Sequence, residues 1–561
     1  MQLNNLPFRK QVWSLITPYW RSSEKWIAWS LLLVVVALNY LTVEIAVFYS
    51  NWNREFFNLM QDKAWQLFWP MLGQFVLLML VFMLVDLVEE YLRRTLRIRW
   101  RRWLTYAFIE QWMKDNNIYR HQLCSKDSDN PDQRITEDIK TFCDMTLSMG
   151  LGLLRTVTSL FSFIVILWGL SGILEFEFAG EQWHIPGYMV WVAIVYSVIG
   201  TWLTHKVARN LIPLNFNQEK VEADFRFHLM RVREHGESVV IQQGEQVEKK
   251  RARQLFGRIF DNWQQLTMMK MRYNALNSAY NEVARIFPYL VAAPRMMTGA
   301  LQLGDMMQTA TGFYRVQEAF SWFVDSYEEV AQWRAVTNRL ITFSVNLEQL
   351  PDVTRFTESE QPQWQALTLH DPQQAPLLQS DAGTLAKHTM LVGASGAGKS
   401  TFFKLLAGIW PYFNGHISMP KKDLCMFIPQ RPYLAYASLQ QVLCYPANSD
   451  KYSANQCQQA LADVGLNGLA DELDKIDHWQ ARLSGGEAQK LMLARALLHQ
   501  PKWLFLDESF SAIDKTAAAS LYQLLKLRMP ESHIIEINHH QQRQSMAKQL
   551  QLRDGNLVVE N

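Results

Sequence analysis

Four long apolar segments in the N-terminal half constrain the fold of this 561-residue chain more than any other feature. They occupy residues 26–50, 68–90, 150–174 and 188–208. A helix needs about 20 residues to cross a hydrocarbon core of about 30 Å. In the first segment, about a dozen Leu, Val, Ile and Phe residues outweigh the cost of one acid, Glu44, at about 3 kcal/mol. We therefore expect membrane-spanning helices, because four such runs would overfill a soluble core.

Two more polar segments, residues 275–301 and 306–330, are candidate fifth and sixth crossings. Charges at membrane depth persist where they face a bundle interior or a wet cavity, so we expect Glu282 and Glu318 to line a cavity. For Asp325 and the acids that follow it, the alternative is that the helix has already left the membrane. Taken alone, each segment fits a buried helix of a soluble bundle equally well.

Loop charges predict the orientation of these helices. Residues 91–104 are densely basic, whereas residues 175–187 contain three acids and neither Lys nor Arg. Cytoplasmic loops of membrane proteins are enriched in basic residues, which places the first stretch and the N-terminus in the cytoplasm. Six crossings then return the chain to the cytoplasm.

Composition excludes several other classes of protein. The formal net charge is only +2 and the basic residues form no long tract, so nucleic acid is not an expected partner. The five cysteines lack zinc-ligand spacing and are expected to be reduced thiols. The first 20 residues do not have the pattern of a secretory signal peptide.

The composition of the sequence changes after residue 345. Residues 346–362 are polar and proline-punctuated, as in a linker. Short β-rich runs then alternate with helical stretches up to residue 561, which is typical of a soluble α/β domain. The predicted fold is an all-α, six-helix transmembrane domain over residues 1–345, followed by an α/β P-loop ATPase domain over residues 363–561.

A phosphate-binding loop opens this second domain. The string GASGAGKST follows an apolar strand and precedes a helix, which is the context that a P-loop requires. Its glycines let backbone N–H groups approach phosphates, its lysine pairs with the β and γ oxygens, and its serine offers a hydroxyl to Mg²⁺. The predicted ATP-binding residues here are Gly393, Ala394, Ser395, Gly396, Ala397, Gly398, Lys399, Ser400 and Thr401.

Two acids end a second apolar strand, in the string KWLFLDES. Such a strand delivers Asp507 to the metal ion and leaves Glu508 to orient or deprotonate the attacking water. An apolar strand capped by two acids is weak evidence alone, but it is strong evidence downstream of a P-loop.

A second glycine turn, in the string LSGGE, has no lysine. With a helix after it, the turn forms another anion-binding helix N-terminus, built from Ser484, Gly485, Gly486 and Glu487. The P-loop of the same chain already surrounds the γ-phosphate. We therefore expect two copies packed head to tail, each turn closing over the nucleotide of the other copy.

These strings resemble the ATPase domain of the ATP-binding-cassette (ABC) transporters, whose signature is LSGGE. The resemblance implies that Gln430 is the Q-loop glutamine, which senses Mg²⁺ and contacts the membrane domain. It also implies that residues 511–514 form the D-loop and that His539 is the switch histidine that contacts the γ-phosphate. The metal ligands it implies are therefore Ser400, Gln430 and Asp507, and the catalytic residues are Glu508 and His539.

Residues 100–105, 130–139 and 428–446 resemble a narrower group of half-transporters. This group includes the peroxisomal acyl-CoA importers and bacterial relatives near the SbmA/BacA peptide-uptake proteins. The resemblance also implies that residues 233–250 form the coupling stretch of this group. Without the resemblance, these residues indicate a solvated charged helix.

Departures from the family pattern affect the adenine site and the segments after two of the motifs. Only His370 or Asp371 stands where many relatives stack adenine on an aromatic ring. His540 follows the switch histidine in place of an arginine, and Ala488 and Lys490 replace other residues after the signature. None of these changes removes a phosphate-handling group.

The predicted function is an ATP-driven, homodimeric transporter of the bacterial inner membrane, with ATP and Mg²⁺ as cofactors and membrane lipid as surroundings. It would move an amphipathic or hydrophobic solute such as a lipid, an acyl compound or a peptide. The chain contains no separate substrate-binding domain, which favours export. The alternatives are an importer of peptides or cofactors, and a membrane-tethered ATPase that signals to or remodels a partner.

Overall fold

The computed structural model of the chain describes residues 7–124, 130–178, 181–351, 356–394, 396–538, 548–553 and 556–560. It contains two compact units. The first unit comprises Met1–Glu110 and Asn130–Val345, and the second comprises Gln111–Asp129 and Asn346–Asn561. The sequence predicts two consecutive domains, so it does not anticipate that residues 111–129 group with the C-terminal part of the chain.

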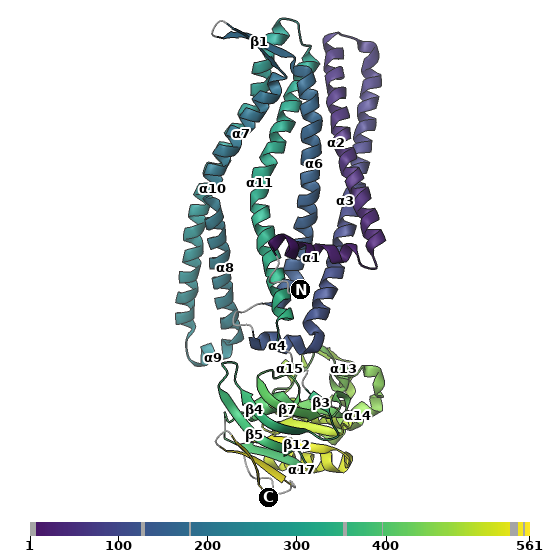
Figure 1. Ribbon diagram of the computed structural model, residues 1–561, viewed down its shortest axis with the longest axis vertical. Coiled ribbons are helices and arrows are strands. Elements are labelled where there is room, and N and C mark those ends of the chain that lie inside the picture. The colour runs from purple at the N-terminus through teal and green to yellow at the C-terminus, as the bar shows by residue number, and fades with distance from the viewer. Residues whose placement is uncertain are drawn as a thin grey trace. The chain divides into compact units, whose positions relative to one another are not determined.

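Within the described residues, the first unit is helical apart from one antiparallel hairpin formed by β1 and β2 (Figure 1). The hairpin lies in the segment predicted to be an outward-facing loop. Gly172, with φ of 65°, ends the helix before it. The elements are α1 (Phe8–Trp20), α2 (Lys25–Gln61), η2 (Trp65–Leu67), α3 (Phe68–Met113), α5 (Pro131–Gln133), η4 (Arg134–Asp138), α6 (Ile139–Ser171), β1 (Ile173–Phe178), β2 (Glu181–Pro186), α7 (Tyr188–Ala208), α8 (Leu211–Glu234), α9 (Gly236–Ile241), α10 (Glu245–Met297) and α11 (Leu303–Glu348).

The long helices extend well beyond the predicted crossings. Helix α2 has 37 residues with neither glycine nor proline, so nothing interrupts its backbone hydrogen bonds before Lys63 adopts a left-handed φ of 54°. Four helical segments of the described residues are long and apolar enough to cross a bilayer: Lys25–Gln61, Trp65–Cys124, Pro131–Ser171 and Tyr188–Glu234. They cover the first four predicted crossings, except that the third prediction runs to residue 174 whereas α6 ends at Ser171.

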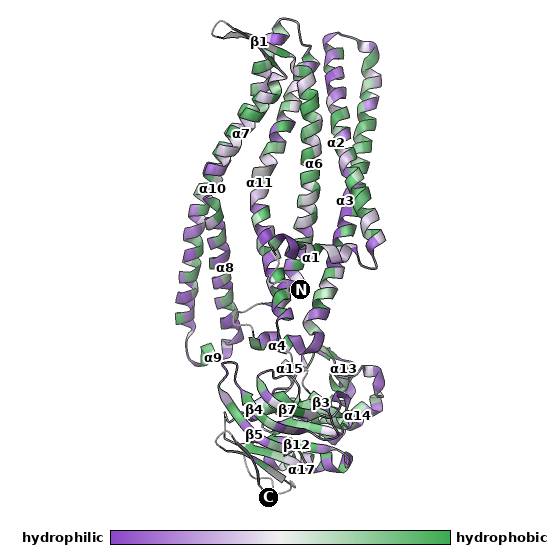
Figure 2. Cartoon of the chain, viewed as in Figure 1, coloured by the Kyte–Doolittle hydropathy of each residue, from purple (hydrophilic) through white to green (hydrophobic). Residues whose placement is uncertain are grey.

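The fifth predicted crossing, residues 275–301, begins within α10 but runs four residues past its end at Met297, and the sixth lies within α11; neither helix is among those four segments. Helix α8 runs beside α10, and both are hydrophilic over the stretch that leads to α9 (Figure 2). Residues 233–250 are therefore the end of α8, the short helix α9 and the start of α10. The prediction of a single charged helix for these residues, made without the family resemblance, is therefore wrong.

Charged residues at the predicted cavity are exposed and paired. Glu282 Oε2 lies 3.2 Å from Arg285 Nη1, and Glu318 Oε2 lies 2.9 Å from Arg315 Nη1. The side chain of Asp325 lies outside the described residues. A cavity-lining role for Glu282 and Glu318 stays a prediction.

The buried carboxylate of Asp138, the last residue of η4, joins η4 to α11; Asp138 is only 3% exposed, whereas the Arg339 side chain is 41% exposed. Arg339 donates to both carboxylate oxygens, at 2.9 Å from Nε and 2.6 Å from Nη2. Arg134 Nη1 donates to the same carboxylate at 2.7 Å. Hydrogen bonding to Asp138 raises the pKa of the Arg339 guanidinium, so the pair is held in its charged form.

The second unit is built on a ten-stranded sheet in the order β3-β7-β4-β5-β14-β13-β6-β12-β11-β8. Strands β13, β6, β12, β11 and β8 pair in parallel, whereas β5, β4 and β7 pair antiparallel. The strands are β3 (Phe356–Glu358), β4 (Gln363–His370), β5 (Pro376–Thr384), β6 (Thr389–Gly393), β7 (Phe413–Met419), β8 (Cys425–Ile428), β11 (Trp503–Asp507), β12 (His533–Asn538), β13 (Lys548–Arg553) and β14 (Asn556–Glu560). Parallel strands end at one edge, so the residues after β6, β8 and β11 converge there.

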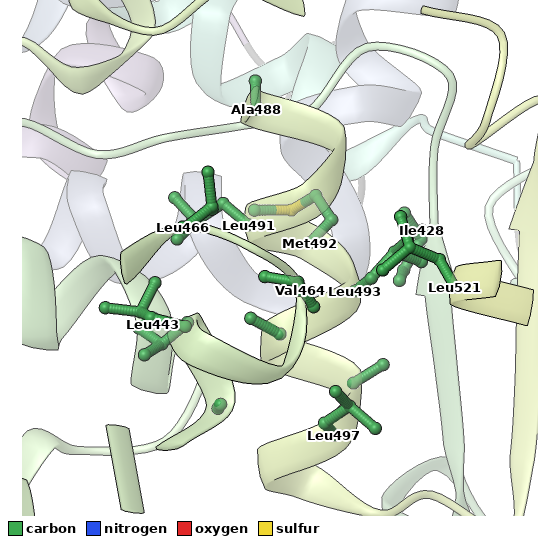
Figure 3. Close-up of a cluster of buried hydrophobic side chains, with 14 of the residues drawn as sticks. Ile428, Leu443, Val464, Leu466, Ala488, Leu491, Met492, Leu493, Leu497 and Leu521 are labelled. Atoms are coloured by element: carbon green, nitrogen blue, oxygen red, sulfur yellow. The ribbon is translucent and has the colours of Figure 1, made fainter. Parts of the chain in front are cut away.

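Helices and short elements complete this unit. They are η3 (Lys114–Asn116), α4 (Asn117–Cys124), α12 (Lys399–Leu406), η5 (Lys422–Leu424), β9 (Ala437–Ser438), α13 (Leu439–Cys444), η6 (Ser449–Lys451), α14 (Ala454–Asp463), η7 (Asn467–Glu472), β10 (Ile476–Asp477), α15 (Trp479–Arg482), α16 (Gly485–His499) and α17 (Lys515–Arg528). Helix α16 is buried on nearly all sides, and its Leu491, Met492 and Leu493 belong to the core shown in Figure 3. That core holds the signature helix in place.

Candidate nucleotide-binding site

The loop between β6 and α12 has the geometry of a P-loop. Strand β6 is buried and ends at Gly393. Gly396 and Gly398 adopt φ of 78° and 94°, a left-handed conformation that glycine adopts at little cost. Gly398 caps α12, so the free N–H groups of that helix face the loop. Ser400 and Thr401 follow in the first helical turn.

The Lys399 side chain folds back onto the loop that precedes it. Its Nζ donates to the carbonyls of Gly393 and Ala394, at 2.6 and 2.8 Å. Burial lowers the pKa of the Lys399 ammonium, and the carboxylates of Glu508 and Asp507 act in the opposite direction. The ammonium therefore lies where an anion with several oxygens would compete with the loop carbonyls for it.

Asp507 ends β11 and is suited to a metal ion. It is 7% exposed, and burial followed by repulsion from Glu508 raises the pKa of its carboxyl group. The Ser400 hydroxyl donates to this carboxylate, whereas Oδ1 has no hydrogen-bond partner among the described residues. A buried oxygen without a partner is costly, and Mg²⁺ prefers carboxylate and hydroxyl oxygens. The donor set of Ser400 and Asp507 fits Mg²⁺.

Glu508 lies one residue further, with a left-handed φ of 48°. Its carboxylate Oε2 accepts a hydrogen bond of 2.7 Å from Gln430 Nε2, which follows the parallel neighbour β8. Gln430 therefore contacts the carboxylate predicted to act on water. This brings together Lys399, Ser400, Gln430, Asp507 and Glu508 at one edge of the sheet.

The signature turn forms the capped N-terminus of α16. Ser484 is the N-cap, and the Glu487 carboxylate accepts from its backbone N–H and hydroxyl at 2.9 and 2.7 Å. Those bonds lower the pKa of Glu487 and keep it ionised. Ser484 and Gly485 are exposed in the single chain, and the hydrogen bonds of Ser484 stay within its own helix.

Gln489 is a connecting residue that the sequence analysis missed. It is buried, its Nε2 donates to Ser511 Oγ at 3.0 Å and to the Glu508 carbonyl at 3.4 Å, and its Oε1 accepts from Ala512 N at 2.9 Å. It therefore ties the signature helix to the D-loop and to the backbone of Glu508. One indication of this role was present in the sequence: Gln489 is a polar residue among the apolar residues of α16.

Residues 111–129 contribute a contact at the other end of the P-loop helix. Lys404 of α12 lies 5.7 Å from the centre of the Tyr119 ring, and Asn116 Nδ2 donates to the Gly408 carbonyl at 3.5 Å. Cys124 Sγ lies 3.4 Å from the Tyr412 hydroxyl. Helix α4 is therefore packed against the end of α12 opposite to Lys399.

The structure does not test the roles predicted for three site residues. Ser395 and His539 lie outside the described residues. His370 Nε2 lies 3.2 Å from Asn414 Nδ2, and its carbonyl accepts from Trp410 Nε1 at 3.1 Å. Its part in binding adenine stays a prediction.

The fold and the site define a membrane protein with a P-loop ATPase unit. Family models agree: residues 14–297 match ABC transporter transmembrane region 2, and residues 384–511 match the ABC transporter ATPase. The chain belongs to the ABC transporter family, and it is an ATP-hydrolysing transporter. The resemblance inferred from the motifs is confirmed.

Individual relatives support the narrower grouping. The chain is 32% identical to the inner membrane ABC transporter ATP-binding protein YddA of Escherichia coli (strain K12), covering 94% of both chains. It is 29% identical to ABC transporter D family member 2, chloroplastic, of Arabidopsis thaliana, covering 92% of this chain and 82% of that one. A bacterial Atm1-family ABC exporter with ATP bound has the same fold, with a TM-score of 0.75 at 17% identity over 96% and 95% of the two chains.

Proposed function

We propose that two copies of this chain form a homodimeric exporter of the bacterial inner membrane, with six crossings per chain and the N-terminus in the cytoplasm. Residues 1–345 would form the transmembrane domain and residues 363–561 the ATPase domain. The similarity to an inner-membrane relative and to the fold of an exporter supports the location and the direction. The transported solute would be amphipathic or hydrophobic.

The single observation that carries the catalytic proposal is the convergence of Lys399, Gln430, Asp507 and Glu508 at one edge of the sheet. Lys399 would exchange its loop carbonyls for the β and γ phosphates of ATP. Ser400 and Asp507 would hold Mg²⁺, with Gln430 beside them. When bound, Mg²⁺ neutralises charge that develops on the phosphates.

Glu508 would orient the attacking water and take its proton. The attack breaks the bond to the γ-phosphoryl group, so ADP and phosphate leave as products. The backbone of Glu508 is held by Gln489, and its carboxylate is held by Gln430. His539 would contact the γ-phosphate in the same step.

The exposed signature turn supports the dimer. Ser484 and Gly485 are exposed on the single chain, where the turn would meet the γ-phosphate bound by the second copy. ATP would then stabilise the closed dimer, and its hydrolysis would release it. Helix α4, packed against α12, supports a route from nucleotide to the membrane helices.

Glu508→Gln tests this proposal, because the amide keeps the contact with Gln430 but cannot take a proton. We expect purified dimers to bind ATP with wild-type affinity, to hydrolyse it at least about a hundredfold more slowly, and to accumulate with ATP trapped inside. Equilibrium binding, phosphate release and a rapid-filtration assay for retained ATP measure these three quantities. Hydrolysis at the wild-type rate would refute the role assigned to Glu508.

A further inference from the structure

Helix α1 lies across the long helices of the first unit (Figure 1). Residues 21–24 connect it to α2, which is long and apolar enough to cross a bilayer. A short helix that turns across the crossings, directly before the first of them, lies along the membrane surface. In the proposed orientation this is the cytoplasmic surface, so lipid headgroups surround α1.

One face of α1 is packed on the first unit, and the other face is exposed. Val12, Leu15 and Tyr19 are buried and follow the i, i+3, i+7 spacing of a single helix face. The Tyr19 ring stacks on the Trp100 ring of α3, with centroids 6.2 Å apart. Trp13, on the outward face, is 61% exposed. Helix α1 is therefore anchored by its inner face and presents its outer face to the surroundings.

Four basic side chains lie on α1 or directly after it. Arg9 and Lys10 belong to the first turn of α1, Arg21 follows its end, and Lys25 opens α2. All four residues are exposed, and none of them forms an ion pair with another residue that the structure describes. Their charges are therefore available to an anion from outside the chain.

The acid closest to these cations in the sequence does not neutralise them. Glu24 is the only acidic residue among residues 7–43. Arg99 Nη1 of α3 lies 3.5 Å from Glu24 Oε2, and Arg102 Nη2 of the same helix donates to Glu24 Oε1. The carboxylate is thus used to join the start of α2 to α3. The surface formed by Arg9, Lys10, Arg21 and Lys25, here called the α1 surface, keeps its excess positive charge.

Exposed tryptophan rings accompany the α1 surface. Trp26 is 79% exposed, and the Lys25 ammonium lies 5.8 Å from the centre of the Trp26 ring. Tryptophan is enriched at the headgroup level of membranes, because its ring is apolar and carries one polar N–H. A soluble anion would meet only the cations. A phospholipid meets the cations with its phosphate and the rings with its glycerol and acyl region.

The geometry points to the α1 surface as a binding site for anionic phospholipids of the cytoplasmic leaflet. This inference rests on the proposed membrane location and orientation, and it names the class of lipid that the protein recognises. A zwitterionic headgroup carries a cation of its own, so it gains less from a surface whose charges are all positive. An anionic headgroup supplies the missing counter-charge.

Native mass spectrometry of the full-length protein tests the inference. The protein is equilibrated without nucleotide in detergent that contains equal amounts of phosphatidylglycerol and phosphatidylcholine with the same acyl chains. The wild-type protein should retain mainly phosphatidylglycerol. The combined variant Arg9→Gln, Lys10→Gln, Arg21→Gln and Lys25→Gln should lower the ratio of the two retained lipids at least about tenfold, since each basic residue near an anionic surface contributes about fivefold. Because all four side chains are exposed, the variant should unfold at the wild-type temperature.

A matched control removes the same number of exposed charges elsewhere. It changes Lys249, Lys250, Arg253 and Arg258 of α10 to glutamine. The last of these residues precedes the fifth predicted crossing by about 25 Å along the helix, at about 1.5 Å per residue. The control should retain phosphatidylglycerol as the wild-type protein does.

Four results would overturn the inference. They are equal retention of both lipids by the wild-type protein, an unchanged ratio in the α1 variant, an equal fall in the control, and displacement of the lipid by inorganic phosphate. The last would assign the cations to a soluble anion. The proposed function is tested separately, because lipid retention is measured without nucleotide, whereas the role of Glu508 is measured by hydrolysis.

Discussion

Removal of the Asp138 carboxylate should destabilise the membrane unit strongly. Asp138→Ala deletes three charge-assisted hydrogen bonds and leaves the guanidinium groups of Arg134 and Arg339 without their shared partner. Breaking a fully buried ion pair on one side typically costs about 3–5 kcal/mol, and because the Arg339 side chain is 41% exposed we take the lower end, about 3 kcal/mol. At roughly 2–4 °C per kcal/mol for a large domain, the melting temperature should fall by at least ~6 °C.

Thermal unfolding of purified full-length protein, followed by tryptophan fluorescence, measures this fall. Arg94→Met is the matched control, because Arg94 is 73% exposed where it pairs with Glu90, and an exposed pair contributes at most about 1 kcal/mol. Asp138→Leu combined with Arg339→Met should recover part of the loss, since the half-buried Arg339 charge is removed together with its partner. A shift for Asp138→Ala no larger than that of the control would refute the argument.

Two further predictions concern the ATPase unit. Arg482 donates to both carboxylate oxygens of Glu472 and holds its pKa at about 2, below the ordinary value of 4.5. A carboxylate whose pKa is depressed in the folded state stabilises the fold above about pH 4.5, and this stabilisation is lost as the pH falls towards 2. Arg482→Gln should therefore flatten the pH dependence of stability between these two pH values. An unchanged acid-unfolding profile would contradict this. A Cβ at Gly486 would lie 2.9 Å from the Ala512 carbonyl, whereas one at Gly485 would meet only the Ala512 Cβ at 3.4 Å. Gly486→Ala should consequently cost about 1–3 kcal/mol in urea unfolding and Gly485→Ala clearly less, and the reverse order would exclude a tight D-loop contact.

Much of this fold follows from local sequence patterns. The apolar runs predict helices because a bilayer imposes length and composition on each crossing. The P-loop and the strand that ends at Asp507 predict their own geometry, since each motif lies within a few consecutive residues. The structure confirms the helical region followed by an α/β ATPase domain.

Other features depend on contacts that no local pattern encodes. Hydropathy marks where a chain enters lipid, but charged residues continue the same helix towards its N-terminus, so α10 has 53 residues, about twice the length of the predicted crossing that begins within it. The grouping of α4 with the second unit depends on Tyr119 meeting Lys404, far along the chain. Gln489 was missed because its role depends on the D-loop, which approaches it only in the folded unit.

Every step proposed for transport requires that two copies share each ATP. Nanodiscs loaded with one copy of the chain, and discs loaded with two, give the most direct test when ATP hydrolysis per chain is compared at saturating Mg²⁺ and ATP. We expect hydrolysis only in the two-copy discs, because each signature turn completes the site of the other chain. An equal rate per chain in one-copy discs would contradict it.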